Sequence, residues 1–224
     1  MHLSPEKSIQ IIALDGAAAT GKSSTADALA HKLKYLHVDT GSHFRILCHY
    51  LIKHKCSHKE SDASLGAFLK TLHIETEVIQ NKAVLKIENQ VLGGKALRTE
   101  AINESVSKFA SIASVRSFLL EYQRSLTAFA QSLDYSGMVV EGRDIGSVVF
   151  PNADLKVFLY ADEQTRIRRR KEEGQIDPIS QRDDLDSKRK LAPLTCPDGA
   201  VKLNTSLLSL EAVVESIIQK IQSE

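Results

Sequence analysis

Residues 9–24 read IQIIALDGAAATGKSS, and this stretch decides the fold. The apolar run at residues 9–14 is rich in isoleucine and stops at Asp15, which is typical of a buried parallel strand. Apolar residues then recur at helical spacing over residues 22–33, which predicts a helix. The turn between them, residues 16–23, fits the pattern GxxxxGK[ST], which predicts a phosphate-binding loop between a strand and a helix.

The chemistry of this loop suits a nucleoside triphosphate. Its glycines let backbone N–H groups approach phosphate oxygens closely, and the following helix adds its positive end. The lysine can neutralise β/γ-phosphate charge, and the hydroxyl after it can bind Mg²⁺. We predict that ATP is held by Gly16, Ala17, Ala18, Ala19, Thr20, Gly21, Lys22, Ser23 and Ser24, with Ser23 as the Mg²⁺ ligand. Such loops serve switches, motors and kinases alike, so the rest of the chain must decide the reaction.

The bulk properties describe an ordinary globular chain. It has 224 residues, of which 42% are hydrophobic and 25% charged, and its net charge of +1 gives no global attraction to nucleic acid or membrane. No window approaches 18 uncharged apolar residues, and residues 1–10 lack the features of a secretory signal. The three cysteines form no CxxC pair. We therefore expect a cytoplasmic monomer with reduced thiols and no nucleic-acid or membrane partner.

The remaining periodicity favours an α/β fold with a parallel sheet. Strands are predicted at residues 138–140 and 155–160, and amphipathic helices at 119–133 and 213–221. Residues 73–91, HIETEVIQNKAVLKIENQV, alternate around two polar turns, which predicts a small antiparallel meander forming a separate inserted lobe. Residues 174–193 are dense in charge with little apolar periodicity, so we expect an exposed, mobile segment there.

Two polar clusters follow predicted core elements. Residues 39–45, DTGSHFR, combine a hydroxyl, a glycine and an arginine that suit an anion, and Asp39 or Thr40 could equally cap a helix. Residues 141–144, EGRD, come directly after a buried strand, where open α/β sheets place their ligands. The alternative for the second cluster is a solvated turn with a surface Arg–Asp pair.

Arginines gather further along the chain. Arg166, Arg169 and Arg170 share one helical face, and Arg182, Asp186 and Arg189 recur at i, i+4 and i+7. Phosphoryl transfer needs cations around the moving charge and exclusion of water, which a closing arginine-rich segment would supply. A solvated basic helix is the alternative. A nucleic-acid patch is less favoured, because aromatic residues are sparse there and the chain is not basic.

A metal-binding module is a further alternative. Cys48, His49, His54, Cys56 and His58 fall within eleven residues. Helical placement would scatter these side chains, and no C-x₂-C or H-x₃-H set appears. We interpret the histidines as surface residues.

With these pieces in place, the chain resembles the bacterial cytidylate kinase family of nucleoside monophosphate kinases from about Ile9 to Ile218. The matching runs are IIALDGAAATGKSS, HVDTGSHFR, LRTEAI, EGRDIGSVVFPNADLKVFL, RDDLDSKR, LAPL and LNTSLLSLEAVVESI. The resemblance implies a P-loop kinase fold, with a core at about 8–60 and 101–224, a monophosphate-binding insert at about 61–100 and a lid at about 166–189.

The resemblance also implies roles for individual residues. Thr40, Gly41 and Arg45 would hold the acceptor nucleotide, and Ser107, Arg116 and Asp144 would read its cytosine base. Arg143 would bind the acceptor phosphate, Arg182 and Arg189 the phosphates, and Asp186 the acceptor sugar. Arg166, Arg169 and Arg170 would belong to the lid over ATP, and Arg98 to the inserted lobe. The catalytic set is then Lys22, Arg143, Asp144, Arg182 and Arg189.

The chain departs from the family pattern in three places. Phe44 stands for a tyrosine, which removes one hydroxyl near the acceptor phosphate. Glu141 stands where aspartate is usual, and only eleven residues separate Arg170 from Arg182, so the lid is short.

The expected reaction is in-line transfer of the γ-phosphoryl group of ATP to CMP or dCMP. Asp39 and Asp144 are both candidates for holding Mg²⁺ through water. A P-loop kinase for another small acceptor, such as UMP, and a nucleotide-gated switch remain the alternatives. The switch differs in that its ATP hydrolysis would not depend on an acceptor.

Overall fold

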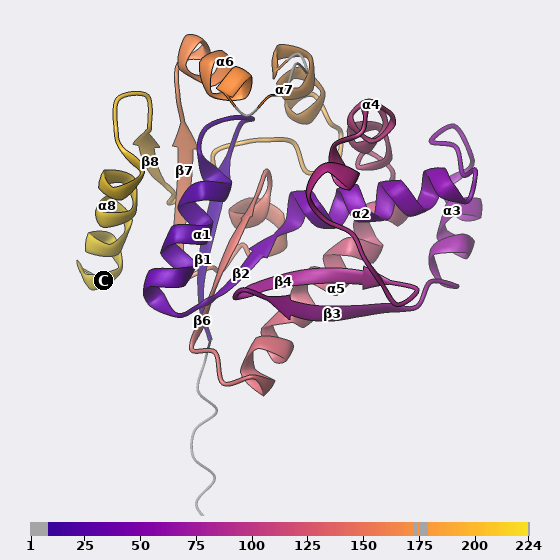
Figure 1. The fold of residues 1–224 in the computed structure, drawn as a ribbon, viewed down its shortest axis with the longest axis horizontal. Coiled ribbons are helices and arrows are strands. Elements are labelled where there is room, and N and C mark those ends of the chain that lie inside the picture. Colours follow the sequence, from indigo (N-terminus) through magenta and orange to yellow (C-terminus); the bar gives the residue numbers. More distant parts are fainter. Residues whose placement is uncertain (1–8, 173, 175–178, 224) are drawn as a thin grey trace, which may run out of the picture.

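The computed structural model describes residues 9–172, 174 and 179–223, excluding the side chains of residues 179–182. Its strands are β1 (Gln10–Gly16), β2 (Leu36–Asp39), β3 (Ile74–Ile79), β4 (Lys82–Ile87), β5 (Gln90–Val91), β6 (Gly137–Gly142), β7 (Leu155–Tyr160) and β8 (Val201–Asn204). Its helices are α1 (Lys22–Leu33), α2 (Thr40–Lys53), α3 (Asp62–Leu69), α4 (Glu100–Phe109), α5 (Ala113–Ser132), α6 (Glu163–Glu172), α7 (Ile179–Ser187) and α8 (Leu210–Ser223). Two short helical segments, η1 (Gly94–Arg98) and η2 (Ile145–Val149), complete the list (Figure 1).

The strands form one sheet in the order β3-β4-β2-β6-β1-β7-β8. From β4 to β8 every neighbouring pair in this order is parallel, as the sequence predicts for the core. The register places Glu141 of β6 beside both Leu14 of β1 and Asp39 of β2. The phosphate loop, the start of α2 and the EGRD run therefore leave the same edge of the sheet, where α/β folds bind ligands.

The meander predicted for residues 73–91 is present, but it does not stand apart from the core. β3 and β4 pair antiparallel, with Gln80 and Asn81 at positive φ in the turn. β4 also pairs parallel with β2 through His37 and Lys82, which extends the central sheet and corrects the expectation of a separate lobe. The physical reason is that Ala83, Leu85 and Ile87 are buried in the main core. The division into core, insert and lid stays a prediction.

Helices cover both faces of the sheet. On one face, α1 and α8 pack over a core that includes Ile12, Leu14 and Val139. On the other face, α2 and α5 pack over a core that includes Val38 and Val140. Successive side chains of a strand point to opposite faces of the sheet, so the neighbours Val139 and Val140 lie in different cores.

The charged segment at residues 174–193 contains a helix that apolar periodicity did not predict. α7 is almost entirely polar, and Figure 1 shows it with α6 above the upper ends of β1 and β7. These two helices therefore lie at the edge of the sheet from which the phosphate loop emerges. In the part of the chain that the structure describes, no helix has the length and apolar character needed to cross a bilayer.

Candidate active site

The phosphate loop has the backbone that its glycines permit. Gly16 and Gly21 adopt φ of 153° and 87°, and a Cβ on Gly16 would lie 2.2 Å from the Leu159 carbonyl oxygen. Lys22 Nζ donates to the Ala17 carbonyl oxygen at 2.6 Å, so the ammonium group lies inside the curl of the loop. Burial, reinforced by the nearby Arg143, holds the pKa of Lys22 well below its ordinary value. An incoming phosphate would relieve this unfavourable charge.

The hydroxyl after the lysine faces a carboxylate that the sequence analysis did not assign to the metal. Ser23 Oγ donates to Glu141 Oε2 at 2.7 Å, and Glu141 is buried. A hydroxyl and a carboxylate oxygen side by side are ligands that suit Mg²⁺. The pairing of β6 with β1 brings them together, and this signal could have been found by asking which strand lies next to the loop.

The two carboxylates proposed for Mg²⁺ from the sequence have other partners. Asp39 accepts the Ser42 amide at 3.0 Å as the cap of α2 and pairs with Lys82 at 3.1 Å. Asp144 pairs with Arg116. The helix-cap interpretation of Asp39 is therefore confirmed, and Glu141 is the carboxylate that contacts Ser23.

Arg143 joins the phosphate loop to a polar cluster, called here the acceptor cluster because its members Arg116, Arg143, Asp144, Asp186 and Arg189 are predicted to hold the acceptor. Its Nη1 donates to the Gly16 carbonyl oxygen at 3.0 Å, and its Nε donates to Asp186 Oδ2 at 3.0 Å. Arg189 lies on the other side of Asp186, with Nη2 3.7 Å from Oδ1. That buried Nη2 has no hydrogen-bond partner among the described residues. A free donor beside the loop is what an anionic ligand requires.

The cluster carries more cations than anions. Arg116, Arg143 and Arg189 surround Asp144 and Asp186, and all five interact electrostatically with their neighbours in the cluster. Burial lowers the pKa of Arg189, and burial raises the pKa of Asp144 although Arg116 opposes that shift. Three guanidinium groups against two carboxylates leave a surplus positive charge that a phosphate would neutralise.

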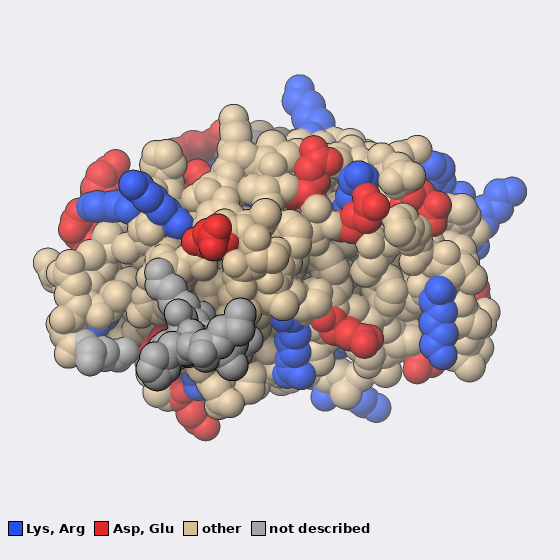
Figure 2. Space-filling view, turned by 90° about the horizontal axis from the view of Figure 1, so that it is seen from below, with Lys and Arg blue, Asp and Glu red and all other residues tan. Residues whose placement is uncertain are grey.

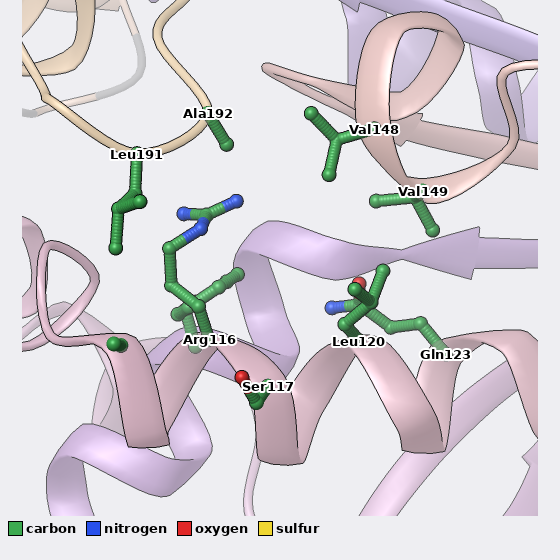
Figure 3. A pocket seen from close by; sticks show the side chains of 10 residues that line it. Arg116, Ser117, Leu120, Gln123, Val148, Val149, Leu191 and Ala192 are labelled. Carbon is green, nitrogen blue, oxygen red and sulfur yellow. The ribbon is translucent and has the colours of Figure 1, made fainter.

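A cavity of about 260 Å³ opens beside Arg116. Figure 3 shows the Arg116 guanidinium rising from α5 toward it, with Leu191 and Ala192 on one side and Val148 and Val149 on the other. The guanidinium carbon lies 5.4 Å from the centre of the Phe44 ring, which also lines the cavity. An apolar lining with few polar groups is typical of a site for a small molecule.

A second cavity, of about 400 Å³, lies at the start of α1 and is partly lined by Gly21, Arg169 and Thr205. Arg169 Nη2 donates to the Thr205 carbonyl oxygen at 2.6 Å, and Thr205 Oγ1 donates to the Thr20 carbonyl oxygen at 2.9 Å. Arg169 is thereby fixed next to the phosphate loop, and its role in a lid over ATP stays a prediction. The cavity continues the loop and is suitably placed for the nucleoside of the donor.

Arg166 and Asp183 connect the lid to the loop. Arg166 pairs with Asp183, whose other oxygen accepts the Ala18 amide at 3.0 Å. Arg170 lies near the end of α6, and Arg182 lies in α7 with its side chain outside the described part of the structure. The predicted position of the Arg182 guanidinium stays a prediction.

The other predicted acceptor residues are spread around the cluster. Thr40 Oγ1 donates to the Glu141 carbonyl oxygen at 2.8 Å, and Gly41 follows it in the first turn of α2. Arg45 Nη1 donates to Leu97 and Asn103 oxygens, 2.8 Å each, and so braces η1 and α4. Arg98 is exposed at the end of η1. Ser107 is half-buried on α4 and does not line the cavity beside Arg116.

The other functional readings gain no support from the structure. Over residues 9–172, 174 and 179–223, no group of three or more histidine, cysteine or acidic residues is placed to hold a metal. On the face drawn in Figure 2, lysines and arginines are scattered among acidic residues rather than gathered into one basic patch.

Comparisons with known proteins agree with the geometry. A family model described as cytidylate kinase matches residues 12–223. The chain is 40% identical to a cytidylate kinase of Chloroherpeton thalassium, over 93% of this chain and 92% of that protein. It is 34% identical to a cytidylate kinase of Acholeplasma laidlawii, over 95% of each. A solved structure of an uncharacterized protein from Eubacterium ventriosum shares the fold, with a TM-score of 0.51 at 11% identity, over 96% of this chain and 99% of that one.

Proposed function

The chain belongs to the cytidylate kinase family and phosphorylates CMP and dCMP with ATP, and we propose that the transfer runs from the loop Gly16–Ser23 to a phosphate held by Arg143 and Arg189. The observation that carries this assignment is the double contact of Arg143. One guanidinium group bonds the Gly16 carbonyl oxygen and the Asp186 carboxylate, so donor loop and acceptor cluster share one side chain. The alternative of a kinase for another small acceptor is not favoured.

On the donor side, Lys22 would bind and partly neutralise the phosphates of ATP. The ammonium group is buried beside Ala17 and Thr20, and a triphosphate in the loop would supply the anion that it lacks. Ser23 and Glu141 would hold Mg²⁺, which would help to neutralise the charge of the phosphates. Arg169 and the cavity at the start of α1 would hold the adenosine.

On the acceptor side, no strong general base is needed, because the attacking oxygen belongs to an ionised phosphate. Arg143 and Arg189 would seat that phosphate, since Arg189 Nη2 has no hydrogen-bond partner among the described residues. The cavity beside Arg116 would take the pyrimidine ring. Asp144 is held by Arg116 at the edge of this site. The hydrogen bond from the Ala18 amide to Asp183 supports a lid that would close over the loop and exclude water.

The finer setting of the activity is also part of the proposal. All three cysteines are free thiols in the structure, which supports a reducing cytoplasm. The net charge of +1 supports free nucleotides, rather than nucleic acid, as the ligands.

A panel of acceptors tests the assignment. ADP production would be measured with CMP, dCMP, UMP and AMP, using the protein, Arg143→Ala and the control Lys32→Ala, whose ion pair with Glu215 lies at the surface. We expect a preference for CMP and dCMP, and a loss of about 10²- to 10³-fold in kcat for Arg143→Ala. Lys32→Ala should match the unmodified protein. Equal activity on AMP, or no loss in Arg143→Ala, would reject the acceptor assignment.

A further inference from the structure

We propose that His37 is a positioning residue for binding of the Mg²⁺–nucleotide: it fixes the Glu141 carboxylate against Ser23. The inference rests on the proposed donor site and assigns a role to a residue that the motifs did not single out. His37 lies on β2, with only 2% of its surface exposed. Its Nε2 is 3.0 Å from Glu141 Oε1.

The contact completes the restraint of one side chain. Glu141 Oε2 accepts from Ser23 Oγ at 2.7 Å, so each carboxylate oxygen has its own partner. The Glu141 backbone carbonyl accepts from Thr40 Oγ1 at 2.8 Å. An ionised carboxylate only accepts hydrogen bonds, so His37 donates through Nε2–H. The carboxylate is thus fixed by His37 of β2 and Ser23 of α1, while Thr40 of α2 fixes the backbone of the same residue.

The far side of the ring shows that His37 acts toward Glu141 and not toward the surface. His37 Nδ1 is buried without a hydrogen-bond partner among the described residues. The nearest charge there is Asp27 Oδ1 at 3.6 Å, on a side chain that is 72% exposed. The well-formed contact is therefore the one to Glu141, and Asp27 supplies a matched control.

The length of the glutamate explains why such a partner is useful. Glu141 stands where the family usually has aspartate, and the additional methylene adds a rotatable bond. A longer side chain reaches Ser23 in more than one conformation unless its second oxygen is held. Partners that orient a metal-binding carboxylate typically change metal affinity by about 10- to 100-fold when removed.

The test measures nucleotide binding rather than turnover. Isothermal titration calorimetry would give the Kd of ATP with excess Mg²⁺ and, separately, with EDTA, for the protein, His37→Leu, His37→Gln and Asp27→Asn. We expect His37→Leu to weaken Mg²⁺–ATP by about 10-fold or more and to leave ATP in EDTA unchanged. His37→Gln, which keeps an N–H donor near the position of Nε2, should stay within about threefold of the protein. Asp27→Asn should change neither affinity.

Two results would overturn the inference. Equal weakening with and without Mg²⁺ would show a general disturbance of the loop, and no weakening in either condition would show that His37 does not act on the site. If His37→Leu proved too unstable to titrate, the cycle of His37→Asn with Glu141→Asp would decide, because the shorter amide of asparagine withdraws the donor from Glu141. The two changes should be coupled in Mg²⁺–ATP affinity, and strict additivity would contradict the proposal. None of these readouts requires an acceptor, so they stand or fall separately from the acceptor panel.

Discussion

The stability of the Asp15→Asn variant, compared with that of the unmodified protein, should increase as pH rises. Asp15 ends the apolar run before the phosphate loop and is fully buried. Its two oxygens accept the backbone N–H groups of Ile145 and Gly146, at 2.7 Å each, and so tie β1 to the turn that follows Arg143. Burial raises the pKa of Asp15 from its ordinary 3.8 to about 6, although both hydrogen bonds favour the ionised form.

The direction of the effect follows from proton binding. Between pH 4 and 6 the folded state holds a proton on Asp15 that the unfolded chain has lost, so the contribution of Asp15 to stability falls as pH rises through this window. From pH 4.5 to pH 7 the loss is about 2 kcal/mol. Asparagine does not titrate. Any constant cost from its unpaired N–H donor, about 1–3 kcal/mol, cancels when the two pH values are compared.

Urea unfolding of both proteins at pH 4.5 and pH 7 measures the effect. The unfolding free energy of Asp15→Asn minus that of the unmodified protein should be about 2 kcal/mol more positive at pH 7 than at pH 4.5. The kcat of the variant should fall, because the turn carrying Arg143 loses one anchor. A pH-independent difference would refute the reasoning, since it would mean that Asp15 titrates equally in both states.

Two further predictions concern the start of α2. Burial lowers the pKa of His43 from its ordinary 6.5 to about 4. As pH falls below 6.5, His43 therefore becomes protonated in the unfolded chain but stays neutral in the folded protein until about pH 4. Between pH 7 and pH 4.5, the free energy of unfolding of the unmodified protein should therefore fall by about 2 kcal/mol more than that of His43→Gln, as measured by urea unfolding. The same pH dependence in both proteins would contradict this. Phe44→Tyr restores a hydroxyl near Arg116, worth on the order of 1 kcal/mol, so the KM for CMP should fall about fivefold in steady-state assays. An unchanged or higher KM would show that the hydroxyl finds no partner there.

Local chemistry made the donor half of the site predictable. The run IIALDG, the glycine loop and the periodic helix after it each agree with one structure, and α1 and β7 have the predicted bounds. The cap of α2 at Asp39 was predictable for the same reason, because its partner, the Ser42 amide, lies three residues away. Local agreement of this kind needs no knowledge of the rest of the fold.

Contacts between distant segments were not predictable from spacing. The pairing of β4 with β2 joins residues more than forty positions apart, and alternation in a strand does not say which neighbour it chooses. α7 was missed because its nine residues carry almost no apolar pattern. The contact of Glu141 with Ser23 was missed because it depends on β6 lying beside β1.

The strand order also explains how one short run could serve both substrates under the proposed assignment. β6 lies between β1 and β2, so Glu141 at its end contacts Ser23 of the donor loop and is bonded by His37 and Thr40 from the acceptor side. Two residues later, Arg143 contacts the Gly16 carbonyl oxygen and Asp186. A strand at the edge of the sheet could not have neighbours on both sides. The position of β6, rather than the composition of EGRD alone, therefore places the donor loop and the acceptor cluster within reach of a single guanidinium group.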